Sequence, residues 1–233
     1  MKFSIAEKIF EKFPTVTIGL VVVKGIDNKG ESREVNSLLR KREKEIMGRF
    51  DTKTLSELPR IGAWRIAYSS FGAKPKKNKC SVENLYRTIL NGTELSHINK
   101  LVDIYNFISI KHMVPVGGDD IDNVDNCISL KFADGTEVFT ELNSDESKNP
   151  KEGEVIYADE KEVLCRRWNW RECDKSKMTE QTKNAALVVE GLLPVTREEI
   201  ESIASELSGL VQKFCGGQAT AFILNKSNPS VEF

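Results

Sequence analysis

Apolar residues recur with two different periods along this chain. Where they return every three or four positions they predict helices, and where they alternate or form short runs they predict strands. The first group covers residues 4–13, 32–50, 59–72, 82–90 and 96–107. Ser81 is expected to cap the helix over 82–90, which should stop at Asn91-Gly92 because a left-handed residue fits easily there.

Strand signals dominate the second half of the chain. The predicted strands cover residues 16–24, 128–132, 137–142, 154–158, 163–167, 185–189 and 219–224. An Asp134-Gly135 turn between the second and third predicts a β-hairpin. The fully apolar run 185–189 is expected to be buried on both faces. Thr196 and Glu199 form a capping box before a last helix whose apolar stripe reaches Phe214.

Helices and strands are clustered rather than alternating, which favours an α+β fold. The chain shows no internal repeat and no low-complexity linker, and its softest stretch is the polar segment 143–153. A length of 233 residues is enough for a substantial core. We therefore expect a single domain over residues 1–233.

Composition narrows the classes of partner. The 34 basic and 35 acidic side chains leave a net charge of −1, so nucleic acid would have to be met by local basic clusters. No apolar run is long enough to cross a bilayer, and Glu7 and Glu11 stand where a signal peptide would be apolar. We expect a cytoplasmic protein without a membrane partner.

Cysteine and histidine usage excludes several kinds of site. The five cysteines are odd in number and lack C-x-x-C spacing, so we expect them to be reduced. Only His97 and His112 exist, which leaves little for zinc sites or for a Ser-His or Cys-His nucleophile. The acidic run 119–125 lacks the ligand spacing of an EF-hand loop. We expect neither a metal nor a cofactor.

The run RRWNWR at residues 166–171 is the most distinctive segment. Indole faces stack on bases and guanidinium groups bind phosphates, so Trp168, Trp170, Arg166, Arg167 and Arg171 are candidates for contact with a nucleotide or RNA. The same alternation fits a strand with tryptophans inward and arginines outward. In that case one or both indoles would shape a pocket. Another local basic cluster, KPKKNK, contributes Lys76 and Lys77.

Two further segments carry polar groups in apolar surroundings. The segment LVDIYNF, containing Tyr105 and Asn106, leads to the pair Gly117-Gly118, whose backbone can approach a ligand closely, and to Asp120 beside it. Glu190 ends the apolar run 185–189, so its carboxylate should be partly desolvated. An ordinary strand-end residue that caps a backbone or pairs with an arginine is the alternative for Glu190.

Five motifs in order resemble the editing domain of the phenylalanyl-tRNA synthetase β subunit. They are GAKPKKNKCSVENLYRTILNG, INKLVDIYNFISI, VPVGGDD, GEVIYADEKEVLCRRWNWREC and TKNAALVVEG, and the resemblance covers roughly residues 60–195. It implies a β-sandwich-like sheet core flanked by helices, with the segments 1–59 and 196–233 packed on it. It also implies mischarged aminoacyl-tRNA as the substrate, and a tRNA and an aminoacyl-tRNA synthetase as partners.

The resemblance also implies roles for single residues. Asn106 matches an asparagine that lines the editing pocket, and Glu190 falls near the pocket glutamate that reads a side-chain hydroxyl. Gly117 stands where that family has a pocket histidine, and RRWNWR replaces a segment rich in small residues. Hydrolysis of an activated ester needs an oriented water and donors for the oxyanion, with no strong nucleophile.

Three hypotheses for function follow. The first is a trans-acting aminoacyl-tRNA deacylase, in which Asn106 and Glu190 orient water and substrate, Gly117 and Gly118 supply backbone donors, and Lys76, Lys77 and RRWNWR receive the acceptor end. The second is a non-catalytic tRNA- or RNA-binding module. The third is a binder or hydrolase of a small amino-acid derivative. Convergence of these residues on one open cleft would favour the first.

Overall fold

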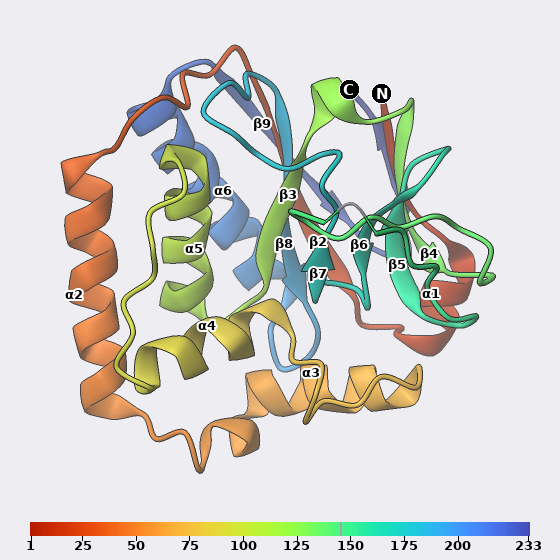
Figure 1. The fold of residues 1–233 in the computed structure, drawn as a ribbon, viewed down its shortest axis with the longest axis horizontal. Helices are drawn as coiled ribbons and strands as arrows, with labels where there is room; N and C mark the ends of the chain where they lie inside the picture. Colours follow the sequence, from red (N-terminus) through yellow and green to blue (C-terminus); the bar gives the residue numbers. More distant parts are fainter. Residues whose placement is uncertain (145) are drawn as a thin grey trace.

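Two β-sheets flanked by helices make up the fold of the computed structural model, which describes residues 1–144 and 146–233 (Figure 1). The helices are α1 (Glu7–Lys12), α2 (Arg33–Arg49), α3 (Pro59–Ser70), α4 (Ser81–Leu90), α5 (Lys100–His112) and α6 (Arg197–Cys215), with 3-10 turns η1 (Leu55–Glu57) and η2 (Ile121–Asn123). The strands are β1 (Lys2–Ile5), β2 (Thr17–Lys24), β3 (Val116–Asp120), β4 (Cys127–Phe132), β5 (Val155–Ala158), β6 (Val163–Arg166), β7 (Arg171–Glu172), β8 (Ala185–Gly191), β9 (Gln218–Leu224) and β10 (Ser230–Glu232). The predicted mixed α+β fold is confirmed.

The smaller sheet has the order β3-β8-β2-β9, with every neighbouring pair antiparallel. All seven residues of β8 are buried, as the apolar run predicted. Helix α6 packs on one face of this sheet, where a Cβ at Gly19 would come within 2.9 Å of the Ala204 Cβ. Glycine at this position therefore permits the close approach of helix and sheet.

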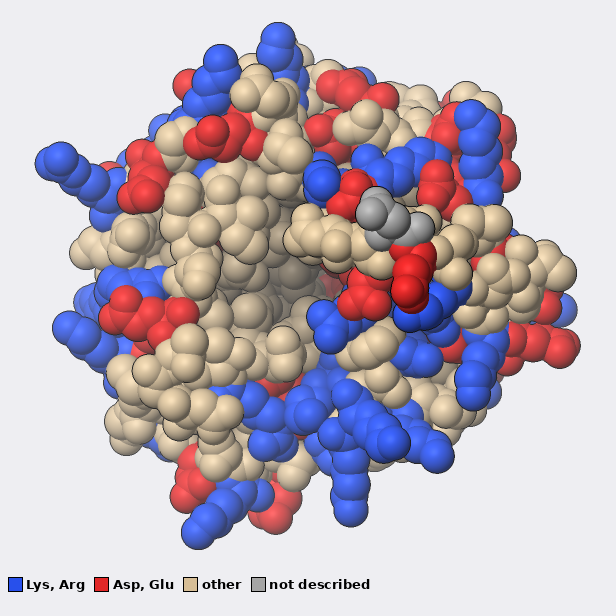
Figure 2. All heavy atoms as spheres, in the orientation of Figure 1, with Lys and Arg blue, Asp and Glu red and all other residues tan. Residues whose placement is uncertain are grey.

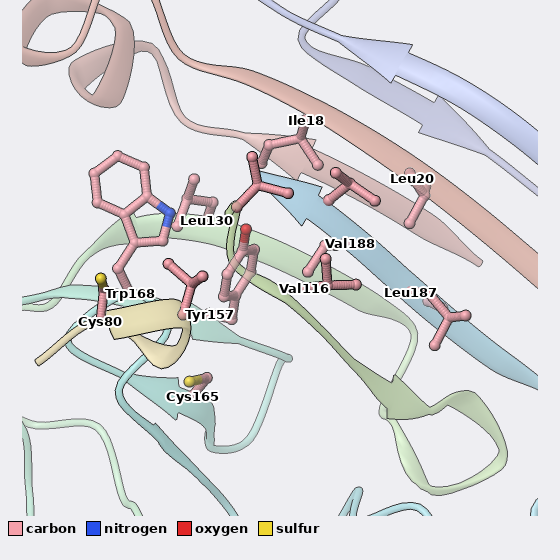
Figure 3. Close-up of a cluster of buried hydrophobic side chains, with 14 of the residues drawn as sticks. Ile18, Leu20, Cys80, Val116, Leu130, Tyr157, Cys165, Trp168, Leu187 and Val188 are labelled. Atoms are coloured by element: carbon pink, nitrogen blue, oxygen red, sulfur yellow. The ribbon is translucent and has the colours of Figure 1, made fainter. Parts of the chain in front are cut away.

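The opposite face of the small sheet meets the larger one, whose order is β10-β1-β4-β5-β6-β7. Figure 3 shows Leu130 and Tyr157 of the large sheet beside Ile18 and Val188 of the small sheet. Because side chains alternate along a strand, Val188 and Glu190 share the face that looks toward the large sheet. The sheets thus bury Glu190 in the space between them.

An aromatic cluster holds the turn between β6 and β7. Trp168 is fully buried, and its ring packs against Phe13 and Trp64 at centroid distances of 4.9 and 5.0 Å. Arg167 and Trp168 have φ values of 47° and 69°, so the chain reverses here. The predicted strand 163–167 accordingly ends at Arg166, and RRWNWR is a strand end, a tight turn and a strand start.

Several sequence-based predictions are corrected. Residues 137–142 do not pair with 128–132 as a hairpin, because β4 is already paired on both sides by β1 and β5. Residues 2–5 form a strand rather than the start of a helix. Ser81 is the first residue of α4 and not its cap, which is Cys80. The helix predicted at 96–107 begins at Lys100 behind an Asn99 cap and continues to His112.

Within residues 1–144 and 146–233, no helix combines the length and apolar character needed to span a bilayer.

Candidate functional site

Three adjoining pockets open between α4, α5, β3 and β7. The mouth pocket has a volume of about 250 Å³ and is lined by Lys77, Lys79, Ser81, Asn84, Leu85, Tyr105, Asn106, Val116, Gly117, Asn169, Trp170, Arg171 and Glu172. Figure 2 shows a hollow in the middle of this face, with Lys and Arg side chains gathered along its lower margin. The basic groups therefore lie at the rim of the site.

The other two pockets share walls with the mouth pocket. The deep pocket, of about 30 Å³, adds Glu190, Tyr157, Trp168 and Asp119 to the shared Gly117 and Asn169. The side pocket, of about 340 Å³, is bounded mainly by apolar side chains. Glu172 lines all three pockets. Glu172 consequently lies in the wall where the mouth, deep and side pockets adjoin.

Glu190 lies at the floor of the deep pocket and is 1% exposed. The hydroxyl of Tyr157 donates a 2.6 Å hydrogen bond to its Oε1, and the amide nitrogen of Asn169 donates one of 2.6 Å to its Oε2. Burial raises the pKa of Glu190 to about 7, against the lowering effect of these two donors and of the Trp168 indole. Both ionisation states of Glu190 are therefore populated near neutral pH.

Asn169 is held in one orientation by its own neighbours. Its Oδ1 accepts hydrogen bonds from the Tyr68 hydroxyl at 2.8 Å and from the backbone N–H of Ser81 at 3.3 Å. The amide nitrogen must then face Glu190, because its oxygen is occupied by two donors. The turn that Trp168 anchors thus delivers a fixed donor to the buried carboxylate.

Two more carboxylates border the deep pocket. Asp119 accepts a 2.6 Å hydrogen bond from the Ser176 hydroxyl, and burial raises its pKa to about 6. Burial also raises the pKa of Glu172 well above its ordinary value, and the nearby Asp119 and Glu190 reinforce the shift. Among the described residues, neither Lys, Arg nor His forms an ion pair with Asp119, Glu172 or Glu190. The floor of the site is acidic and lacks a protein cation.

The glycine pair has a structural role in this arrangement. A Cβ at Gly117 would lie 3.4 Å from Oε1 of Glu172, so glycine leaves the carboxylate room in the pocket. A Cβ at Gly118 would collide with the carbonyl oxygen of Ala186 at 2.3 Å. The hydrogen bonds Glu190 N–H to Pro115 O and Ile121 N–H to Asn184 O turn the odd-numbered residues of β3 toward β8. The N–H of Gly118 therefore points away from β8.

At the mouth, Trp170 lies between two guanidinium groups. Arg171 lies 5.0 Å from its ring centroid, lines the mouth and keeps 53% of its side chain exposed. Arg167, predicted to bind RNA, lies 4.3 Å from the same ring but pairs with the buried Glu154 at 3.4 Å and does not line the mouth pocket. Lys77 comes from the loop before α4, while Tyr105 and Asn106 come from α5. The structure thus brings Asn106, Gly117, Trp170 and Arg171 to one opening above Glu190.

Four other predicted residues are placed elsewhere. Arg166 is only 8% exposed and donates two hydrogen bonds to Glu154, so its guanidinium is engaged inside the protein. Trp168 is fully buried and cannot stack on RNA, although its ring lines the deep pocket. Asp120 accepts hydrogen bonds from Thr182 and from the backbone of Asp122, and its neighbour Asp119 faces the pocket. Lys76 is exposed but does not line the pocket.

Sequence reasoning missed Asn169, Glu172, Asp119 and Tyr157. Asn169 stands between the two tryptophans of RRWNWR, a place where a polar residue inside an aromatic run was a usable signal. Glu172 and Tyr157 carried none, because their importance arises from which strands become neighbours. Among the described residues there is also no group of three His, Cys, Asp or Glu placed to hold a metal ion.

Most of the chain matches one known protein family. A family model described as the B3/4 domain matches residues 63–216. The chain belongs to the B3/4 domain family. The match includes α4, α5, β3, the β6–β7 turn and β8, and so contains the lining of the three pockets of this B3/4 domain except Phe3 of β1.

A solved structure is similar to this chain over nearly its whole length. No curated protein matches the sequence. Among solved structures, this B3/4 domain is similar to an N-terminal fragment of the phenylalanyl-tRNA synthetase β subunit from Pyrococcus horikoshii, with a TM-score of 0.48 and 12% identity. The alignment covers 96% of this chain and 54% of that one, so the B3/4 domain spans about half the length of the fragment.

Proposed function

We propose that this protein hydrolyses the ester bond of aminoacyl-tRNA in trans, with residues 1–233 acting as one domain. The observation that carries the proposal is the change from basic and aromatic side chains at the mouth of the site to acidic side chains at its floor. A basic, aromatic mouth opens above a buried carboxylate, Glu190, whose pKa of about 7 suits a general base. B3/4 domains occur in the phenylalanyl-tRNA synthetase β subunit, which supports a tRNA-related substrate.

The deep pocket has the dimensions required for the hydrolytic water. Its volume of about 30 Å³ is sufficient to admit a water molecule, and Glu190 borders it. Ionised Glu190 takes a proton from that water while the water oxygen attacks the ester carbonyl carbon in the mouth pocket. Tyr157 and Asn169 hold the carboxylate in position through both of its oxygens.

The remaining step releases the tRNA. The tetrahedral intermediate carries its negative charge on the former carbonyl oxygen, which on this proposal accepts hydrogen bonds from the N–H of Gly118 and the side-chain amide of Asn106. The bond between the carbonyl carbon and the ribose oxygen then breaks, and the proton held by Glu190 passes to that oxygen. The products are a free amino acid and a tRNA with its terminal hydroxyl restored.

The mouth suits the acceptor end of a tRNA. Lys77, Lys79 and Arg171 line it and would bind backbone phosphates, while Trp170 offers an aromatic surface for a terminal base. The net charge of −1 gives no long-range attraction, so binding should depend on these few contacts and weaken with salt.

Incubation with a panel of mischarged tRNAs tests the proposal. Loss of the amino acid from at least one of them should exceed spontaneous ester loss by 10²-fold or more, on the order of one general base. Glu190→Gln is the matched inactive control, because glutamine keeps both hydrogen bonds. Absence of deacylation above the spontaneous rate for every tRNA would exclude the enzymatic function.

A non-catalytic tRNA-binding module is the second candidate, and the same panel separates the two. Its motivation is the exposed Arg171 beside Trp170 at the mouth. On this hypothesis intact aminoacyl-tRNA binds, Arg171→Ala weakens that binding, and Glu190→Gln changes neither binding nor ester lifetime.

A further inference from the structure

Glu172 occupies the junction of the three pockets. It is the one acidic residue that borders the mouth, deep and side pockets together, and its Oε1 lies beside the open position at Gly117. Strand β7 supplies Glu172 through its pairing with β6, where Cys165 is its partner. A ligand that extends from the mouth toward Glu190 or into the side pocket therefore has this carboxylate in the wall beside it.

Among the described residues Glu172 forms no ion pair, although the pockets that it borders are also lined by basic side chains, namely Lys77, Lys79, Arg171 and Lys177. The titratable groups around it are Asp119 on β3, Glu190 on β8, Cys165 on β6 and Tyr105 on α5. All four are neutral or acidic, while the basic groups Lys77 and Arg171 line the mouth. A buried carboxylate among other carboxylates favours a cationic ligand, because the ligand restores the charge balance that the protein does not supply.

Unfilled hydrogen-bonding positions mark the same place independently of the acidic groups. Trp168 is fully buried and lines the deep pocket, where its indole N–H is near enough to Glu190 to lower the pKa of that carboxyl but makes no well-directed hydrogen bond to any described residue. The hydroxyl oxygen of Ser81, which lines both the mouth and the deep pocket, is likewise buried and unpaired. Buried polar groups are nearly always paired, so these two indicate where a ligand completes the network.

The side pocket suits an apolar part of the ligand. Its walls include Ile98, Val102, Leu142 and Met178, and it reaches Glu172 past Tyr105. Its volume of about 340 Å³ exceeds that of any single aliphatic side chain. An amino acid whose α-carbon lies at the junction can therefore direct an apolar side chain into this pocket while its ester stays in the mouth.

We propose that Glu172 binds the α-ammonium group of the aminoacyl ester and that the side pocket receives an apolar side chain. This inference rests on the proposed function for the ester itself. The substrate class is thus an aminoacyl ester with a free α-amine and an apolar side chain, and N-blocked esters are excluded. Glu172 binds the substrate, and Glu190 remains the base.

Stable amide analogues test this without any need for turnover. The probes are 3′-aminoacylamino-3′-deoxyadenosines carrying leucine, N-acetyl-leucine or serine, with affinities measured by calorimetry on the full chain. We expect the leucyl probe to bind at least tenfold more tightly than the N-acetyl probe, which has no charged amine for Glu172, and at least tenfold more tightly than the seryl probe, which does not fill the side pocket. Equal affinities for the leucyl and N-acetyl probes, or no binding of any probe, would overturn the inference.

Variants then assign the effect to one residue. In Glu172→Gln the preference for the free amine over the N-acetyl probe should disappear, whereas Glu141→Gln, which alters an exposed carboxylate paired with Arg171, should keep it. A preserved preference in folded Glu172→Gln would overturn the assignment to Glu172. If Glu172→Gln does not fold, the three-probe comparison on the unaltered protein still decides the inference. Deacylation of a tRNA panel is scored separately, so failure of the enzymatic function and failure of amine recognition give different results.

Discussion

Two sets of buried carboxylates in this protein differ in what surrounds them. Glu83 and Glu154 are buried beside arginines: Glu83 pairs with Arg65 and Arg87 at 2.8 Å, and Glu154 pairs with Arg166 at 2.8 Å. Asp119 and Glu190, which are buried, and Glu172, which is partly buried, border the deep pocket, and the hydrogen bonds to Asp119 and Glu190 come from neutral donors. Arginines balance the charge of the carboxylates in the first set, whereas no described Lys, Arg or His forms an ion pair with a carboxylate of the second set.

The difference separates structural from functional burial. A buried carboxylate next to an arginine forms an ion pair that ties two segments of the chain together, as Glu154 does with Arg166 of β6. A buried carboxylate without a cation has a raised pKa, as at Glu190, and can exchange a proton or accept a cationic ligand near neutral pH. Only the second set borders a pocket that a substrate can enter.

The strongest test of this contrast is Glu190→Gln. Glutamine reproduces the protonated state, because its amide donates to the Tyr157 oxygen and accepts from Asn169, but it cannot take a proton from water. We expect deacylation to fall by about 10²–10⁴-fold with the fold intact, measured as kcat/KM above the spontaneous rate together with circular dichroism. An unchanged rate would remove Glu190 from catalysis.

The opposite pattern is expected for Glu154→Gln. This change leaves the Arg166 guanidinium buried without its charged partner, which should lower the free energy of unfolding by about 3 kcal/mol. Urea denaturation at pH 8 measures it, with Glu190→Gln as the matched control that should lose no stability. Similar losses in both variants would erase the distinction between the two sets.

The dependence of stability on pH sharpens the comparison further. Burial raises the pKa of Glu190 to about 7 and that of Asp119 to about 6, so between pH 4 and 7 the folded state holds protons that the unfolded state has released. Their contribution to stability is full below pH 4 and is lost as pH rises to 7, on the order of 3 kcal/mol for Glu190. Glu190→Gln should flatten this decline in unfolding experiments from pH 4 to 8. Parallel curves for the two proteins would contradict the assigned pKa.

The smallest effect is expected at the rim. Arg171→Ala should weaken tRNA binding a few-fold and reduce the slope of log K against log salt by about one, because one phosphate contact is lost. Fluorescence anisotropy measures both quantities. Lys161→Ala is the charge-matched control, since Lys161 is exposed and pairs with Asp125 away from the pocket, and it should bind like the unaltered protein. An equal effect of the two changes would show that the mouth does not contact tRNA.

Local sequence signals predicted the strongest elements well. The capping box at Thr196 and Glu199 is present at the start of α6, and the apolar run 185–189 is the central strand β8. These features depend on contacts between residues a few positions apart, which a periodicity records directly. The hairpin over 128–142 failed for the opposite reason, because β4 pairs with β1 and β5 from distant parts of the chain.

The same division holds for the site. The sequence by itself determined that Glu190 closes a buried strand, that Gly117 and Gly118 carry no side chains, and that RRWNWR combines aromatic and cationic groups. Only the tertiary structure decided that Trp168 is buried, that Asn169 reaches Glu190, and that Arg166 belongs to an internal ion pair. Whether a buried carboxylate has a cation beside it depends on which distant strands are packed together. No local pattern records that neighbourhood, and it is what distinguishes Glu190 from Glu154.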